Sequence, residues 1–288
     1  MVVDFHMHPL VRDAEYIPNL ATVVERFFRP NVRNQMERDI RGRTLEDVIG
    51  EMDEAGIEKG VVVAMDLTSA LGIVMVTNDP VARMVGEHPD RFIGFASVDP
   101  NLGDAAVREL ERAVRELGLR GLKLAPPVQR FAPNDDRFNP LWEEALELGV
   151  PVWLHTGHQL STQGSIAKFG HPMLVDELAL RYPDLVIIMG HCACPWFWDA
   201  WSVCCRHENV YMDLSVYTDL YHHFPWDAFA SYGQEHKLLF ATDYPFSDFE
   251  SSLKAISDLN ISEDFKRKIL GENALKVLGI ENDRGGEG

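Results

Sequence analysis

The sequence predicts an α/β protein of the (β/α)8 TIM-barrel class that folds as a single domain. Eight short apolar segments of strand length occur along the 288 residues, and each is followed by a segment with helical character. Strands buried on both faces of a parallel sheet have this continuous apolar composition, and eight β/α units in a chain of this length are typical of a barrel. A doubly wound open sheet is the alternative fold that the same alternation allows.

The order of the elements follows from apolar runs and from helix-capping signals. The first strand contains Asp4-Phe5-His6-Met7-His8 and is preceded by valines. Thr44 is a typical N-cap, and Gly56 and Gly118 end two of the helical segments. The later strands are expected at residues 60–65, 92–98, 121–125, 151–155, 185–191, 210–214 and 238–243. Helices are expected at residues 44–56, 80–87, 104–117, 140–148, 172–181, 197–205, 226–232, 251–259 and 263–278.

The expected domain comprises residues 1–280, and residues 281–288 form a tail that we expect to be frayed. Residues 10–43 are an insertion directly after the first strand, rich in charges but containing the apolar pairs Val23-Val24 and Phe27-Phe28. The apolar pairs indicate a short helix packed on an apolar surface. A long insertion at this position is a candidate lid over a site, and a packing excursion is the alternative.

The acidic composition limits the classes of partner. The formal net charge is −18, from 45 Asp and Glu against 27 Lys and Arg. This charge disfavours nucleic acid and anionic membranes, because phosphate groups are bound mainly by Lys and Arg. We expect a small-molecule substrate, and an anionic one is compatible with the charge because a metal ion and one or two arginines can dominate a local pocket. A homodimer is the oligomer considered.

Targeting and cysteine signals favour a cytoplasmic protein. The first residues lack the charged and apolar regions of a signal peptide, and no apolar run approaches the ~18 residues that a membrane span requires. Cys192, Cys194, Cys204 and Cys205 match neither a disulfide framework nor a zinc-binding spacing. We therefore expect reduced, buried thiols.

Histidine and acidic side chains gather at the expected carboxyl ends of the strands. His6 and His8 are two residues apart, so they project from the same face of the first strand. His155, His191 and Asp243 each end an otherwise apolar strand. Because barrel active sites lie at this end of the strands, the set predicts a metal site. Imidazole and carboxylate ligands suit Zn²⁺ best, with Mn²⁺, Fe²⁺ or Co²⁺ as alternatives.

A divalent metal ion with an open coordination position would generate hydroxide from bound water near neutral pH. Asp243 can then serve as a ligand and as the proton acceptor. His191, if it is not itself a ligand, can orient the water or polarise a substrate carbonyl. Lys123, near the end of the fourth strand, has three interpretations. It contacts an anionic substrate group, it is carbamylated and bridges two metal ions, or it pairs with a nearby acid.

Three further residues are candidate substrate contacts. Arg130, in the loop after the fourth strand, is a candidate clamp for a substrate carboxylate, with a solvated arginine as the alternative. His158 follows His155 in the loop after the fifth strand, where it can contact the substrate or support a ligand. Trp196 is the tryptophan nearest the end of the sixth strand and is a candidate pocket wall.

Several segments carry a recognisable combination of residues. They are the His6 and His8 pair, Gly121-Leu122-Lys123-Leu124, Leu154-His155-Thr156-Gly157, Met189-Gly190-His191, Ala241-Thr242-Asp243-Tyr244-Pro245-Phe246 and Gly271-Glu272-Asn273-Ala274-Leu275-Lys276-Val277-Leu278-Gly279. Together they resemble the amidohydrolase-related TIM-barrel family that contains aminocarboxymuconate semialdehyde decarboxylase, over nearly the whole chain. Ala125 departs from the family, where histidine often follows the Lys-Leu pair.

The resemblance implies a set of roles for the strand-end residues. His6, His8, His155 and Asp243 would be metal ligands, and His191 would be the catalytic residue that contacts water or substrate. It also implies one metal ion per chain, with Lys123 uncarbamylated.

Three functions are compatible with this site. The first choice is a metal-dependent hydrolase that attacks a small amide, ester or lactone with activated water. The second is a metal-dependent, non-oxidative decarboxylase of an aromatic or unsaturated carboxylic acid, in which His191 or Asp243 delivers a proton to the carbon that loses CO₂. The third is a non-catalytic metal-binding protein. It is disfavoured because a structural metal site does not need both His191 and Asp243.

Overall fold

The structure is a computed structural model that describes residues 1–8, 20–30, 33 and 44–281. All eight predicted strands are present and run parallel. They are β1 (Val3–Met7), β2 (Lys59–Val63), β5 (Phe92–Phe95), β6 (Leu122–Leu124), β7 (Val152–Leu154), β8 (Ile187–Met189), β9 (Val210–Asp213) and β10 (Leu238–Leu239). They pair in the order β1-β2-β5 and, separately, β6-β7-β8-β9-β10.

Two seams join these sheets into one barrel. Between β5 and β6, Ala96 forms a parallel bridge with Leu122. Between β10 and β1, the Phe5 amide donates to the Phe240 carbonyl over 2.9 Å, and Met7 bridges to Tyr244. Closure at both seams confirms the predicted TIM barrel and excludes the doubly wound open sheet.

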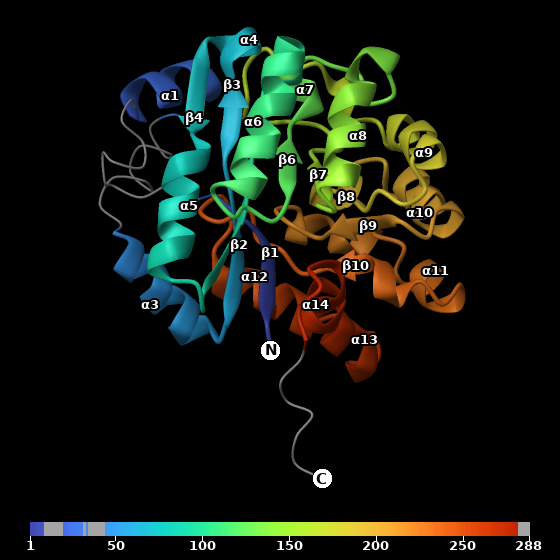
Figure 1. Cartoon of the computed structure of the whole chain (residues 1–288). Helices are drawn as coiled ribbons and strands as arrows, with labels where there is room; N and C mark the ends of the chain where they lie inside the picture. The colour runs from blue at the N-terminus through green and yellow to red at the C-terminus, as the bar shows by residue number, and fades with distance from the viewer. Residues whose placement is uncertain (9–19, 31–32, 34–43, 282–288) are drawn as a thin grey trace.

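The helices follow the strands around the outside of the barrel (Figure 1). They are α1 (Leu20–Phe27), α3 (Leu45–Ala55), α4 (Thr68–Leu71), α5 (Asn78–Glu87), α6 (Asp104–Arg115), α7 (Pro126–Gln129), α8 (Asn139–Glu147), α9 (Pro172–Arg181), α10 (Phe197–Arg206), α11 (Trp226–Ser231), α12 (Phe249–Ser257), α13 (Glu263–Arg267) and α14 (Asn273–Val277). Thr44 caps α3 as predicted, since its hydroxyl accepts from the Asp47 amide over 3.2 Å. The predicted last helix is interrupted by a π-helical turn, Lys268–Glu272.

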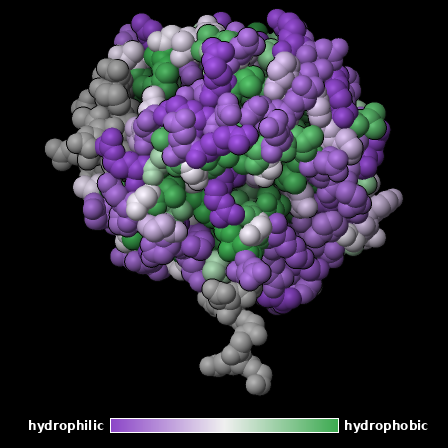
Figure 2. Space-filling model, viewed as in Figure 1, coloured by the Kyte–Doolittle hydropathy of each residue, from purple (hydrophilic) through white to green (hydrophobic). Residues whose placement is uncertain are grey.

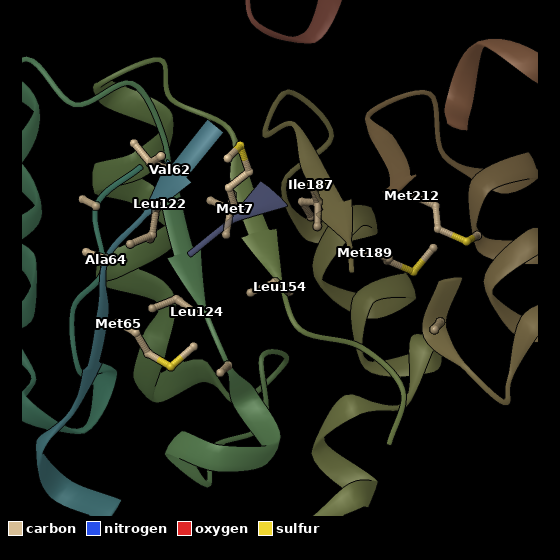
Figure 3. Packing of buried hydrophobic residues seen from close by; sticks show 14 of the residues in the cluster. Met7, Val62, Ala64, Met65, Leu122, Leu124, Leu154, Ile187, Met189 and Met212 are labelled. Carbon is tan, nitrogen blue, oxygen red and sulfur yellow. The ribbon is translucent and has the colours of Figure 1, made fainter. Parts of the chain in front are cut away.

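The alternation of side chains along the strands produces two apolar layers. One layer lies between the strands and the helices, and Figure 3 shows part of it, including Leu122 and Leu124 of β6. The other fills the barrel interior with Val61, Phe95 and Trp153, among others, and Leu275 of α14 packs against it. Lys123, which lies between Leu122 and Leu124 on β6, therefore faces the interior, where its Nζ lies 5.4 Å from the Trp153 ring centre.

A register shift in β1 directs the two histidines into the barrel. Asp4 pairs with Gly60 and Met7 with Val62, so three steps along β1 correspond to two along β2. Such an extra residue changes which face the following side chains occupy. Phe5 belongs to the interior layer, Met7 to the outer layer, and the His6 ring lies 4.1 Å from that of Trp153. In a regular strand His6 would face the side opposite to Phe5, which points into the interior. The shift allows His6 to lie beside the interior Trp153 as well.

The hairpin formed by β3 (Met65–Leu67) and β4 (Ile73–Val76) was not predicted. Its second strand is an apolar run of four residues, and a run this short does not distinguish a strand from a turn of buried helix. Helix α1, predicted from the apolar pairs of the insertion, contacts β4. The rest of the predicted insertion (residues 9–19, 31–32 and 34–43) and residues 282–288 of the predicted tail lie outside the described residues.

The two ends of the barrel differ in their coverings. In Figure 1 the N-terminus and α14 lie at the bottom, whereas α1, α4 and α7 lie at the top, near the carboxyl ends of the strands. Hydrophilic residues cover most of the face shown in Figure 2. Among the described residues, no helix combines the length and the apolar character needed to cross a membrane.

Candidate active site

Three predicted metal ligands converge at the carboxyl end of the barrel. His6 and His8 come from the end of β1, and Asp243 from the segment after β10; one ligand atom from each lies within 4.8 Å of the others. His8 Nε2 is 3.1 Å and His6 Nδ1 is 3.4 Å from Asp243 Oδ1. All three side chains are buried. The sequence prediction that first and last strands share one site is therefore matched by this geometry.

The ligand atoms of this group fit a divalent metal ion. Both ring nitrogens of His6 and the Oδ1 atom of Asp243 are buried without a hydrogen-bond partner among the described residues. A buried polar atom without a partner costs about 1–3 kcal/mol, so several together at one point need compensation. A divalent ion bound by imidazole nitrogen and carboxylate oxygen supplies that compensation.

Burial also sets the protonation of the candidate ligands. It lowers the pKa of His6, His8 and His155 well below the ordinary value, so these rings are neutral and their lone pairs are available at pH 7. Burial lowers the pKa of Lys123 to about 7, although the carboxylates of Asp243 and Asp213 oppose the shift.

A buried carboxylate fixes the position of Asp243. The Asp4 side chain accepts from the His6 amide (3.1 Å), from the Thr242 amide (3.0 Å) and from the Thr242 hydroxyl (2.6 Å). The Asp243 amide in turn donates to the His6 carbonyl over 2.8 Å. Asp243 has a φ of +63°, a conformation that costs a non-glycine residue roughly 1–2 kcal/mol. The bonds to β1 hold this strained residue with its carboxylate toward the histidines.

His155 and His191 lie side by side next to the converging group. Their ring centres are 4.4 Å apart, and the His191 ring is 5.3 Å from that of His6. His155 Nε2 is buried without a hydrogen-bond partner among the described residues. His155 does not belong to the converging group of three, so its ligand role remains a prediction.

A cavity of about 260 Å³ opens beside these side chains. His8, Lys123, His155, His191 and Asp243 form its polar side. Its other walls come from α1, from the β3–β4 hairpin and from the segments after β6, β7, β9 and β10; they are Phe27, Met65, Met75, Ala125, Gln159, Leu160, Ser161, Val216, Tyr217 and Phe246. The cavity is thus apolar on one side and carries a buried lysine and the candidate metal group on the other.

The three other predicted substrate contacts lie off this cavity. Arg130 is exposed, and its Nε donates to the Gly164 carbonyl over 3.2 Å. His158 and Trp196 contact each other, with ring centres 4.7 Å apart, but neither lines the cavity. Loop residues are directed by tertiary contacts that the sequence pattern does not reveal, and the substrate contacts expected of these three residues stay predictions.

Sequence reasoning missed the buried acids that support the site, Asp4 and Asp213. Asp213 ends the apolar strand β9, the same signal that identified Asp243, and it accepts from the His191 amide over 2.8 Å. Asp4 interrupts an otherwise apolar and aromatic strand and is fully buried. Both signals were present in the sequence but do not distinguish a supporting acid from a ligand.

Comparison with known proteins decides the family. Residues 3–280 match the family described as amidohydrolase (Amidohydro_2). The chain belongs to this family. The resemblance inferred from the strand-end motifs is thereby confirmed.

Two curated relatives of this amidohydrolase family member are named as decarboxylases. A gamma-resorcylate decarboxylase of Polaromonas sp. (strain JS666) is 27% identical over 283 residues, which cover 79% of this chain and 85% of the relative. A 2-amino-3-carboxymuconate-6-semialdehyde decarboxylase of Dictyostelium discoideum is 26% identical over 253 residues, covering 75% and 68%. These relatives place the chain in an enzyme family and favour the second predicted reaction, decarboxylation, over hydrolysis.

Solved structures confirm the barrel of this family member. A TIM-barrel protein of Bordetella bronchiseptica has a TM-score of 0.80 and 25% identity, covering 96% of this chain and 98% of that one. A 2,6-dihydroxybenzoate decarboxylase complexed with 2,6-dihydroxybenzoate has a TM-score of 0.74 at 21% identity, covering 97% and 99%. A dihydroxybenzoic acid decarboxylase of Polaromonas sp. JS666, with bound manganese and 2-nitroresorcinol, has a TM-score of 0.70 at 22% identity, covering 96% of each chain.

Proposed function

We propose that the protein is a metal-dependent, non-oxidative decarboxylase of a small aromatic or unsaturated carboxylic acid. The observation that carries the proposal is the largely apolar cavity, which is also lined by the buried Lys123 and by His8 and Asp243, two members of the converging group. Similarity to decarboxylases along most of the chain supports the same reaction.

His6, His8 and Asp243 would hold the metal ion, with His155 as the further predicted ligand. A divalent ion there supplies a Lewis acid for substrate oxygens. Zn²⁺ suits the ligand atoms, and Mn²⁺ is equally favoured because a related decarboxylase structure contains it. A single converging group among the described residues supports one ion per chain.

The apolar walls suit the substrate's carbon skeleton. Phe27, Met65 and Met75 offer flat or adaptable apolar surface opposite the polar side, and burial of a ring against them excludes water from the reacting carbon. Lys123, whose amino group is buried and lines the cavity, binds the anionic group of the substrate in its protonated form. An aromatic acid such as 2,6-dihydroxybenzoate, the ligand of a related structure, is the first substrate to test.

In the reaction, the bond between the carboxyl carbon and its neighbour breaks, CO₂ leaves, and the neighbouring carbon gains a proton. His191 and Asp243, which both line the cavity, are the residues proposed to carry that proton. Both lie on the polar side, so either can reach a carbon held between that side and the apolar walls. Hydrolysis would use the same residues, which is why an assay must separate the two reactions.

The test is a substrate panel assayed in parallel for two products. Protein loaded with Mn²⁺ or Zn²⁺ is given hydroxybenzoates and unsaturated carboxylic acids, with CO₂ release measured, and esters, amides and lactones, with hydrolysis measured. We expect CO₂ release from at least one acid and no comparable hydrolysis. Metal-dependent hydrolysis without CO₂ release from any acid would reject the proposal in favour of a hydrolase.

A further inference from the structure

A fully buried carboxylate at the end of β9 collects four hydrogen bonds directly behind His191. Asp213 Oδ1 accepts from the His191 amide (2.8 Å), the Ser215 amide (3.1 Å) and the Ser215 hydroxyl (2.6 Å). Asp213 Oδ2 accepts from the Trp153 indole N–H over 2.5 Å. Neither Asp213 nor Ser215 is exposed at all, so no solvent competes for these bonds.

These bonds determine where the Ser215 hydroxyl proton lies. Backbone amides and the indole nitrogen can only donate, so both oxygens of Asp213 are acceptors. A proton on Oδ1 would point into two N–H groups that already converge there. The Ser215 hydroxyl therefore donates its single proton to Asp213, and its oxygen is left to accept.

The acceptor oxygen of Ser215 meets the His191 ring. His191 Nδ1 lies 2.7 Å from Ser215 Oγ, and both groups are buried. Since Ser215 has no second proton to give, His191 Nδ1 must carry the hydrogen of this bond. In the neutral ring, Nε2 is then unprotonated, and it belongs to a side chain that lines the cavity.

We propose that Ser215 is a positioning residue, which together with Asp213 holds His191 in the Nδ1–H tautomer and presents an unprotonated Nε2 to the cavity. The use made of Nε2 rests on the proposed function, but the tautomer does not. A His191 that could turn or change tautomer would lose this directed lone pair.

The backbone next to His191 and Ser215 has positive φ angles, which fit a positioning role. His191, Cys192 and Ala193 have φ angles of +58°, +54° and +52°, and Val216, directly after Ser215, has a φ of +71°. Such angles are costly for residues with a Cβ and persist only where the surroundings over-determine them. The Asp213 bonds to the His191 and Ser215 amides provide that constraint on both segments.

The tautomer can be measured on the full-length, zinc-loaded protein without any substrate. Protein labelled with ¹⁵N-histidine is examined by long-range ¹H–¹⁵N correlation, in which protonated and unprotonated ring nitrogens resonate at well-separated positions. The His191 signals are assigned by their loss in His191→Phe. We expect Nδ1 protonated and Nε2 unprotonated in the wild type, and a shift toward the Nε2–H form in Ser215→Ala.

Activity and metal content complete the test. With the best acid from the substrate panel, Ser215→Ala should lower kcat at least about tenfold, with little change in KM or metal stoichiometry, because only the proton-carrying group is perturbed. Ser215→Thr, which retains the hydroxyl, should keep the wild-type tautomer and most of kcat. Ser252→Ala, which removes a buried hydroxyl bonded to the Asp248 carbonyl on α12, is the matched control and should behave as wild type.

Two results would overturn the inference. One is a wild-type spectrum in which His191 Nε2 carries the proton, and this result does not require the Ser215→Ala variant to fold. The other is a folded Ser215→Ala variant with an unchanged tautomer. Failure of every acid to release CO₂ would count against the proposed function instead, because the spectra are recorded without substrate.

Discussion

The Thr242 hydroxyl donates to the Asp4 carboxylate over 2.6 Å, joining the first barrel strand to the residue that precedes Asp243. The bond closes the barrel at the same place where the candidate metal ligands meet. Because His6 and His8 follow Asp4 and Asp243 follows Thr242, the spacing of the ligands depends on this contact. The same hydrogen bond thus contributes to closure of the barrel and to the position of the candidate ligands.

Thr242→Val should weaken both the fold and metal binding. The substitution keeps the side-chain shape but removes a donor to Asp4 and the acceptor of the Tyr244 amide. We expect a loss of about 1–3 kcal/mol in the free energy of unfolding, measured by urea denaturation, because a buried carboxylate loses a partner. Metal affinity should fall roughly tenfold or more, as for other residues that support ligands. Thr77→Val, at an exposed threonine without a side-chain capping bond, should change neither quantity.

Alanine variants should distinguish the residues that bind the metal ion from those that only lie next to it. His6→Ala, His8→Ala and Asp243→Ala each remove a member of the converging group and should abolish stoichiometric binding of Zn²⁺ or Mn²⁺. His155→Ala tests the fourth predicted ligand and should weaken binding. Metal content after equilibrium dialysis is the measurement, with His88→Ala, at the carboxyl-terminal cap of α5, as the control. Full metal content in His8→Ala would refute the assignment of the site.

Lys123→Met should impair substrate binding without removing the metal. The methionine preserves much of the buried apolar stem but deletes the positive charge that faces the cavity. Loss of one charge-assisted hydrogen bond to an anionic substrate corresponds to a roughly 10- to 100-fold rise in KM. A fall in metal stoichiometry from two to one or zero, restored by added short-chain carboxylates, would show instead that Lys123 is carbamylated and bridges two ions.

Gln163→Ala should loosen the cover of the cavity. The Gln163 side chain donates to the Glu25 and Arg26 carbonyls of α1 over 2.9 and 2.7 Å. The backbone N–H of Gln163 donates to the Phe27 carbonyl over 3.0 Å. Phe27 is the wall that α1 contributes to the cavity. Without the two side-chain bonds, we expect a several-fold higher KM with nearly unchanged unfolding temperature, since α1 lies outside the barrel. Gln234→Ala, in the segment between α11 and β10, is the control; an unchanged KM in Gln163→Ala would argue against α1 as a lid.

The sequence was sufficient for the barrel because its strands are buried on both faces and therefore read as apolar runs. It was also sufficient to bring His6, His8 and Asp243 together, since residues that end parallel strands meet at one edge. What it could not supply is the register shift between Asp4 and Met7, which depends on the pairing of β1 with β2. That shift, and not strand alternation alone, aims His6 at the interior.

The loops account for most of the remaining differences. Arg130, predicted to contact the substrate, is absent from the cavity lining, and its Nε donates to the Gly164 carbonyl over 3.2 Å. Conversely, Val216 and Tyr217 line the cavity although nothing in their local pattern indicates it. Loop direction is decided by tertiary hydrogen bonds such as that from the Tyr217 hydroxyl to the His158 carbonyl, which no local pattern encodes.

The most direct test of the account is the rate of CO₂ release during stepwise addition of Mn²⁺ to metal-free protein. With an acid that the panel identifies, we predict no release without metal, a linear rise and a break at one ion per chain, and no response in His8→Ala. Release of CO₂ by the metal-free protein, an unchanged titration in His8→Ala, or a break at two ions per chain would contradict a single-metal decarboxylase centred on His6, His8 and Asp243.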